Sequence, residues 1–224
     1  MKQIEGGVTA AKGFEAAGVN AGIKYKNRND MALIFSEKPC VAAGVFTTNV
    51  VKAAPVLWDR NLIDHYDDMH AVVINAGIAN ACTGEEGMDY CKKTSEAAGK
   101  LFNIDASSVA VASTGVIGMQ LPIDRIVNGI SLLKEAKGNT LNHGHVAAQS
   151  IMTTDTKPKE IAFQFEVAGK TATIGGMCKG SGMIHPNMCT MLAYICTDCD
   201  ISKEMLDRCA KTDIPDTFNM ITVD

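Results

Sequence analysis

A glycine-rich loop that runs into a single threonine constrains this chain more than any other feature. The loop reads Lys179-Gly-Ser-Gly-Met-Ile-His-Pro-Asn-Met-Cys-Thr190, and residues 191–196 continue it as an apolar run. Gly180 and Gly182 permit the backbone angles that a strained, scissile peptide bond needs. If the chain cleaves itself before Thr190, the new α-amine can deprotonate the Thr190 hydroxyl, because α-amines titrate near neutrality. The alternative is a β-branched residue that opens a buried strand.

Size and charge exclude several classes of protein. The chain has 224 residues, 46% of them hydrophobic, and a formal net charge of −4. Such a chain can bury a large core as one domain or two, and its charge is not that of a nucleic-acid-binding protein. The first twenty residues lack the apolar block of a signal peptide, and no later stretch reaches the ~20 apolar residues that span a bilayer. We therefore expect a cytosolic protein without a membrane partner.

The cysteines do not suggest a disulfide scaffold, a metal site or redox chemistry. Eight are present, mostly within apolar segments, which is typical of reduced, buried thiols. Cys196 and Cys199 form a CxxC, but it has no second pair at zinc-finger spacing, and His143 and His145 lie far upstream in an expected loop. No phosphate-binding Gly-x-x-x-x-Gly-Lys-Ser/Thr motif occurs. We predict no bound metal and no nucleotide cofactor.

Hydrophobic periodicity predicts strands alternating with helices. Apolar runs indicate strands at 31–36, 41–47, 71–75 and 109–113, with Lys38-Pro39 separating the first two. The spacing of apolar residues predicts helices over 84–101 and from Pro122 to Gly138. Alternation at 161–167, followed by Ala168-Gly169-Lys170, predicts a hairpin with a second strand through Ile174.

The last third of the chain contains three further expected elements. Residues 191–196 are predicted as a buried strand, and a short helix over 202–210 starts at Ser202 as its N-cap. Residues 218–223 are predicted as a final strand. Because the chain stops inside that strand pattern, we expect that it is part of a longer protein.

Two further motifs place hydroxyl groups where they can act on a substrate. Ser113-Thr114-Gly115 follows the strand at 109–112, and a hydroxyl next to a flexible backbone N–H is what an oxyanion hole requires. The same tripeptide is also an ordinary turn. Met152-Thr-Thr-Asp-Thr156 is polar enough to bind a zwitterionic amino acid, or else forms a solvated loop. Lys179 can hold a substrate carboxylate, or is a surface lysine.

These stretches together resemble the glutamate N-acetyltransferase/ornithine acetyltransferase family of arginine biosynthesis. The similarity runs along the whole chain in the same order. The matching segments are Gly6-Gly-Val-Thr-Ala-Ala-Lys-Gly-Phe14, Asn75-Ala-Gly-Ile-Ala-Asn80, Ser113-Thr-Gly-Val-Ile-Gly118, Met152-Thr-Thr-Asp-Thr156, and Lys179-Gly-Ser-Gly-Met-Ile-His-Pro-Asn-Met188 with Thr190-Met-Leu-Ala.

The resemblance implies an α/β fold, an αββα sandwich that is incomplete in this chain. It implies a precursor of about twice this length that cleaves itself, here between Cys189 and Thr190, where the family usually has alanine in place of the cysteine. Residues 1–189 then correspond to the α-chain, and 190–224 to the start of the β-chain, whose remainder is missing here. By the same resemblance Thr190 is the nucleophile, Thr114 and Gly115 are the oxyanion-hole pair, and Thr153, Lys179 and Thr190 bind substrate.

The implied activity is ping-pong transfer of an acetyl group from N-acetylornithine to glutamate through an acetyl-threonine. Acetyl-CoA is a possible further donor, no other cofactor is expected, and two cleaved protomers are expected to form a heterotetramer. Two alternatives stay open: an aminopeptidase or amidase with an N-terminal nucleophile, and an inactive fragment that needs its missing half. We expect no self-cleavage of the fragment alone, because part of the structure that would hold the strain is absent.

Overall fold

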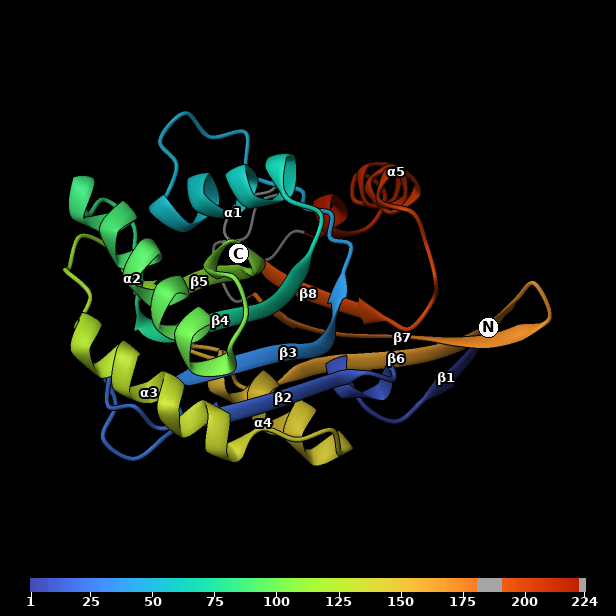
Figure 1. Cartoon of the computed structure of the whole chain (residues 1–224), viewed down its shortest axis with the longest axis horizontal. Coiled ribbons are helices and arrows are strands. Elements are labelled where there is room, and N and C mark those ends of the chain that lie inside the picture. The colour runs from blue at the N-terminus through green and yellow to red at the C-terminus, as the bar shows by residue number, and fades with distance from the viewer. Residues whose placement is uncertain (181–190, 222–224) are drawn as a thin grey trace.

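The chain forms two four-stranded sheets that pack face to face in the computed structural model, which describes residues 1–180 and 191–221 (Figure 1). The first sheet has the order β2-β3-β4-β5 and contains one parallel pair, β4 with β5. The second has the order β1-β6-β7-β8 and is antiparallel throughout. The strands are β1 (Lys2–Ile4), β2 (Phe14–Val19), β3 (Met31–Cys40), β4 (Met69–Ile78), β5 (Val109–Val116), β6 (Lys159–Val167), β7 (Lys170–Lys179) and β8 (Leu192–Thr197).

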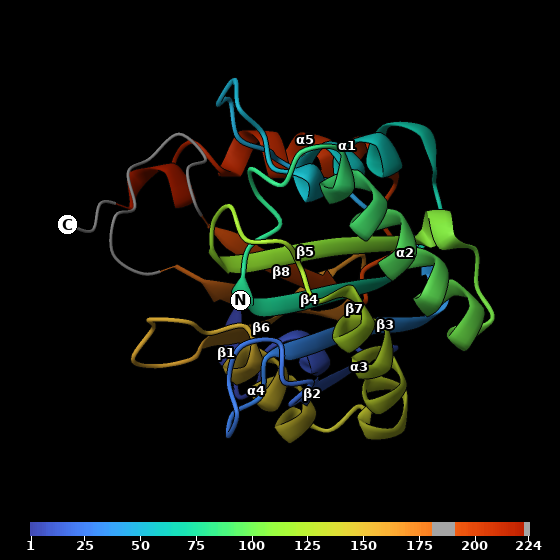
Figure 2. The same cartoon turned by 90° about the vertical axis from the view of Figure 1, so that its left-hand side faces the viewer.

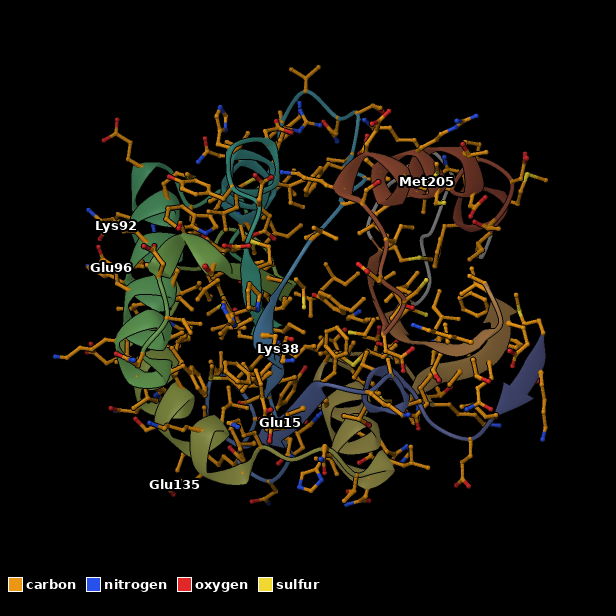
Figure 3. All side chains as sticks on the ribbon, turned by 45° about the vertical axis from the view of Figure 1, so that its right-hand side comes forward. Glu15, Lys38, Lys92, Glu96, Glu135 and Met205 are labelled. Carbon is orange, nitrogen blue, oxygen red and sulfur yellow. The ribbon has the colours of Figure 1, made fainter. Side chains whose placement is uncertain are left out.

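Two helices cover the outer face of the first sheet. They are α2 (Glu85–Phe102), which makes the crossover between the parallel strands, and α3 (Ile123–Ala136). Their apolar sides meet Met31, Leu33 and Phe35 of β3, which are all buried. The opposite side of α2 is polar, and Figure 3 shows Lys92 and Glu96 on it. Lys92 Nζ lies 3.9 Å from Glu96 Oε1 in an i,i+4 ion pair.

The second core lies between the two sheets. Alternate residues of β3 and β4, among them Ala32, Ile34 and Ile74, turn inward and meet Met177 and Cys196 of the second sheet. This alternation is the period of two that a strand imposes on its side chains.

The remaining helices lie at the margins of the sandwich. Helix α4 (Leu141–Ser150) runs along β2 and packs Ala147 and Ala148 into the core between the sheets. Helix α1 (Ala54–His65) covers the free edge of β5 and contacts α2, and α5 (Lys203–Asp213) follows β8. Short 3₁₀ helices are η1 (Val8–Ala10), η2 (Ala106–Ser108) and η3 (Phe218–Met220).

The outer face of the second sheet carries apolar side chains. Ile161 and Ile195 lie there with 47% and 58% of their surface exposed, next to half-buried Phe163. Of the described helices, α4 makes the main contacts with β6 and β7, and it does so from the inner side. The predicted α/β sandwich is therefore confirmed, and its described layers are helices, sheet and sheet.

Most of the predicted elements are confirmed. Helices occur at 85–102 and 123–136, and the hairpin of β6 and β7 turns at Ala168 and Gly169. Ser202 caps α5, its hydroxyl accepting the N–H of Met205. The strands at 71–75, 109–113 and 191–196 correspond to β4, β5 and β8.

Three predictions from the sequence are wrong. Residues 41–47 form no strand, because β3 continues through Lys38-Pro39 to Cys40, where its pairing with β4 ends at Met69 after a register shift. Residues 218–220 form a 3₁₀ helix whose N–H groups bond backward along the chain, as in the bond from Met220 to Thr217, and residues 222–224 lie outside the described residues. His143 and His145 lie on helix α4 rather than in a loop.

Candidate functional site

The carboxyl end of β5 places Thr114 and Gly115 at one end of the sandwich. In the parallel pair with β4, Thr114 lies opposite Ala76, and Gly115 lies opposite Gly77. Thr114 shares its face with Ala112, which belongs to the core between the sheets, so its half-buried side chain is on the inner face. The backbone of Gly115 is exposed. A hydroxyl and the backbone amide of an exposed glycine therefore lie next to each other at a strand end.

Only glycine can occupy position 115. Its φ is +136°, and a β-carbon there would lie 2.2 Å from the carbonyl carbon of Gly77. Gly77 also has a positive φ, +110°. The two strands approach each other backbone to backbone at the point where the oxyanion pair is predicted.

A hydrogen-bonded pair fixes the same strand ends on the opposite face. The Ser113 hydroxyl donates to Asn75 Oδ1 at 2.6 Å, and Asn75 Nδ2 donates to the carbonyl of Ile78 at 2.8 Å. Asn75 is 4% exposed, so this pairing satisfies an amide that burial would otherwise penalise. No role was predicted for Asn75, although an asparagine directly after the apolar run 71–74 was a usable signal.

Lys179 is not a surface lysine. It is 8% exposed, at the end of β7, and its Nζ lies 3.3 Å from Asp155 Oδ2. Asp155 Oδ1 accepts a hydrogen bond from Lys159 Nζ at 2.9 Å. Burial acts to raise the pKa of Asp155, but the bonds from Lys159 and from the Thr153 N–H, with the charge of Lys179, hold that pKa below its usual value.

Thr153 lies in the same cluster. Its N–H donates to Asp155 Oδ2 at 3.2 Å, and its carbonyl accepts from the Arg28 guanidinium at 3.3 Å. Two lysines thus share one carboxylate beside a threonine, so the cluster carries net positive charge. Asp155 was noticed in the sequence only as a carboxylate among hydroxyls, and Arg28 was missed because it is distant in the chain.

The two parts of the site lie at the same end of the molecule. Figure 2 shows β4, β5 and β7 ending on one side of the sandwich, together with the loop that precedes β6. Cys189 and Thr190 lie outside the described residues. Leu192, two positions after Thr190 in the sequence, pairs with Lys179. The predicted residues Thr114, Gly115, Thr153 and Lys179 are thus gathered at one end of the two sheets.

Helix α1 supports β5 from its free edge. Asp59 Oδ1 accepts the N–H of Val111 at 2.9 Å, and Trp58 Nε1 donates to the carbonyl of Val109 at 3.4 Å. Burial raises the pKa of Asp59 to about 8 despite the bond from Val111. The hydroxyl of Tyr194, on β8, is buried and has no hydrogen-bond partner among the described residues. Burial raises the pKa of Tyr194, and the charge of Asp59 adds to the shift.

The described cysteines are free thiols, and burial raises the pKa of Cys91 and of Cys196 to about 12. Such thiols are poor nucleophiles. Within residues 1–180 and 191–221, no three His, Cys, Asp or Glu side chains are arranged to hold a metal ion. No helix in this part of the chain is long and apolar enough to cross a membrane.

The sequence profile of the ArgJ family matches residues 15–224. The chain belongs to the ArgJ family. Among curated ArgJ-family relatives, the arginine biosynthesis bifunctional protein ArgJ of Thermotoga neapolitana is 48% identical over 214 residues, covering 95% of this chain and 53% of the relative. The protein of that name from Lactococcus lactis is 47% identical over 224 residues, covering 100% of this chain and 55% of the relative. The chain thus spans about half the length of these ArgJ-family relatives.

Solved ArgJ structures share the fold. The bifunctional protein from Bacillus halodurans superimposes with a TM-score of 0.79 at 43% identity, covering 85% of this chain and 97% of the solved one. The ornithine acetyltransferase of Mycobacterium tuberculosis, solved with ornithine, gives a TM-score of 0.74 at 42% identity over 84% of this chain and 96% of its own.

A more distant structure shares only the fold with this ArgJ-family chain. An L-aminopeptidase D-Ala-esterase/amidase from Ochrobactrum anthropi, described as a variant of the Ntn hydrolase fold, has a TM-score of 0.54 at 14% identity. It covers 95% of this chain and 68% of its own.

Proposed function

We propose that this chain is the part of an ornithine acetyltransferase that carries the nucleophile and the oxyanion hole. The reaction moves an acetyl group from N-acetylornithine to glutamate, a step of arginine biosynthesis in the cytosol. The observation that carries the proposal is the gathering of Thr114, Gly115, Thr153 and Lys179 at one end of the sandwich. Family membership and the ornithine-bound relative support the choice of substrate.

The nucleophile of the proposed reaction is Thr190, freed by cleavage of the Cys189–Thr190 bond. Its α-amine takes the hydroxyl proton while the oxygen attacks the acetyl carbonyl. The Thr114 hydroxyl and the Gly115 N–H donate to the oxyanion of the tetrahedral intermediate. Ornithine leaves with the proton, and the acetyl-threonine ester is then attacked by the amine of glutamate, which regenerates the hydroxyl.

Lys179 and Thr153 are the proposed substrate-binding residues. The Lys179 ammonium is buried, and its carboxylate partner among the described residues, Asp155, also pairs with Lys159. This excess of positive charge fits the α-carboxylate that acetylornithine and glutamate have in common. Both substrates can therefore use one subsite in turn, as a ping-pong mechanism requires.

Chain lengths support the proposed cleavage. The curated relatives are nearly twice as long as this chain. The two solved ArgJ chains are shorter than this chain, because about 85% of this chain covers nearly all of each of them. A precursor that is divided near the glycine-rich loop has these properties. We further propose that the C-terminal part present in the relatives completes the substrate pocket and that two cleaved protomers form a heterotetramer.

The deciding experiment follows the acetyl group. Protein extended by the C-terminal part that the relatives have is incubated with acetyl-labelled N-acetylornithine and glutamate. We expect the label on glutamate. Label released as free acetate would instead identify a hydrolase, and label on neither would contradict the proposal. Replacing N-acetylornithine by acetyl-CoA in the same assay tests whether acetyl-CoA is a second donor.

Intact-mass measurement tests the cleavage itself. In the extended protein we expect two chains separated between Cys189 and Thr190, and a single chain in Thr190→Ala. A break at the same bond in Thr190→Ala would show that Thr190 does not drive it.

A further inference from the structure

We infer that Arg28 is a positioning residue, which holds the loop carrying Thr153 in register with the strand ends that carry Thr114 and Gly115. The effect of Arg28 on catalysis rests on the proposed function. The bridge that Arg28 makes between two parts of the site can be tested without it.

Arg28 binds two successive carbonyls of the loop that carries Thr153. Its Nη2 donates to the carbonyl of Met152 at 2.5 Å, and Nη1 donates to that of Thr153 at 3.3 Å. A planar guanidinium with two parallel donors fixes the orientation of both peptide groups. A lysine can reach only one of these carbonyls well.

The peptide of Thr153 is held from its other side as well. The Thr153 N–H donates to Asp155 Oδ2, the oxygen that also faces Lys179. Arg28 and Asp155 therefore fix the carbonyl and the N–H of the same residue. Since both contacts are charge-assisted, they are stronger than ordinary turn hydrogen bonds.

Hydrogen bonds hold the segment that presents Arg28. Residues 20–30 wrap around the carboxylate of Asp30, which is fully buried and accepts the N–H groups of Ala21 at 2.8 Å and Ile23 at 2.7 Å. The carbonyl of Asp30 accepts the N–H of Ala76, on β4, at 2.8 Å. These bonds fix the position of the segment that carries Arg28 relative to β4.

Tyr25 completes the bridge. The Arg28 guanidinium lies 4.5 Å from the centroid of the Tyr25 ring, a cation–π distance. Tyr25 Cε2 would lie 3.3 Å from a β-carbon built on Gly77, and Gly77 is the residue that backs Gly115. The Tyr25 ring thus lies beside Gly77, between the strand ends that carry Gly115 and the Arg28 guanidinium.

Hydrogen exchange of the chain as it stands tests the bridge without any reference to activity. We expect the amides of 152–156 to exchange about tenfold faster in Arg28→Ala than in wild type. In Arg28→Lys we expect a smaller increase in the exchange rate, because the lysine still donates to one of the two carbonyls. The control is Arg60→Ala, since Arg60 also lies over an aromatic ring, 5.5 Å from Phe46, but on exposed α1. No change in Arg28→Ala, or equal acceleration of all segments, would overturn the inference.

Kinetics of the extended protein test whether Arg28 affects substrate binding. Arg28→Ala should raise KM for N-acetylornithine about tenfold while kcat changes less, because a displaced binding loop weakens ground-state and transition-state binding alike. Arg28→Lys should recover part of the loss. A fall in kcat at unchanged KM would contradict a positioning role. An extended wild-type protein without transferase activity would refute the proposed function but leave the exchange result to decide on the bridge.

Discussion

Gly77 and Gly115 face each other across β4 and β5 so closely that a β-carbon on Gly115 would lie 2.2 Å from the carbonyl carbon of Gly77. No side chain fits between these backbones, and a shift of either strand would move the amide of Gly115. The proposed oxyanion hole therefore depends on a contact between two residues that lie on different strands.

Gly115→Ala should destabilise the chain by at least about 2 kcal/mol more than Gly118→Ala, because strained backbone and a steric clash add at position 115. Gly118 is the matched control, since its φ is also positive, +81°, but nothing lies within 4 Å of its added β-carbon. Urea denaturation of both variants measures the difference. Equal losses of unfolding free energy in the two variants would mean that β4 and β5 separate easily at Gly115.

Thr114→Ala tests the oxyanion hole. Removing one donor to an oxyanion typically costs about 2.7–4 kcal/mol of transition-state stabilisation, so the extended enzyme should slow by roughly two to three orders of magnitude. Initial rates of acetyl transfer give the measurement, with Thr171→Ala on the distant hairpin as control. An unchanged rate would remove Thr114 from the mechanism.

Asp155→Asn should change stability in acid. The folded-state pKa of Asp155 lies below that of the unfolded chain, so its ionised form stabilises the fold above about pH 4, and this contribution is lost as the pH falls through the folded pKa. As the pH falls below about 4, wild type should therefore lose stability more steeply than the variant. Thermal melts over this range provide the test, with Asp207→Asn, from an exposed i,i+4 pair, as control.

Asp59 should give the wild-type protein the opposite pH dependence, which Asp59→Asn should abolish. Burial raises the pKa of Asp59 from 3.8 to about 8, so the folded chain keeps a proton that the unfolded chain releases, and stability falls as the pH rises through this window. The slope is at most about 1.4 kcal/mol per pH unit. Asparagine keeps an acceptor for the Val111 N–H and removes the slope.

Urea denaturation at pH 5 to 8 measures this slope, with Asp64→Asn on the exposed side of α1 as control. A variant whose stability falls with pH as steeply as that of wild type would show that Asp59 is ionised in the fold.

Elements with a strong local period could be predicted from the sequence. Ile126, Ile130 and Leu133 of α3 recur at helical spacing, and they are the residues that the core buries. The strand predicted at 41–47 could not be excluded in this way, because the composition of 41–47 suits a strand. No described strand pairs with residues 41–47. The helix at 141–150 was missed for a related reason: its apolar side is made of small residues, Ala147 and Ala148, which give a weak periodic signal.

The sequence by itself determined the type of most elements, the family, and the candidate residues Thr114, Gly115, Thr153, Lys179 and Thr190. These follow from local spacing and from motifs, which need no knowledge of how the segments pack. Only the tertiary structure placed Lys179 against Asp155, Gly77 behind Gly115, and Arg28 on the carbonyl of Thr153, 125 positions away. Contacts of this kind depend on the stacking and register of two sheets, which a period of two or of 3.6 residues does not specify.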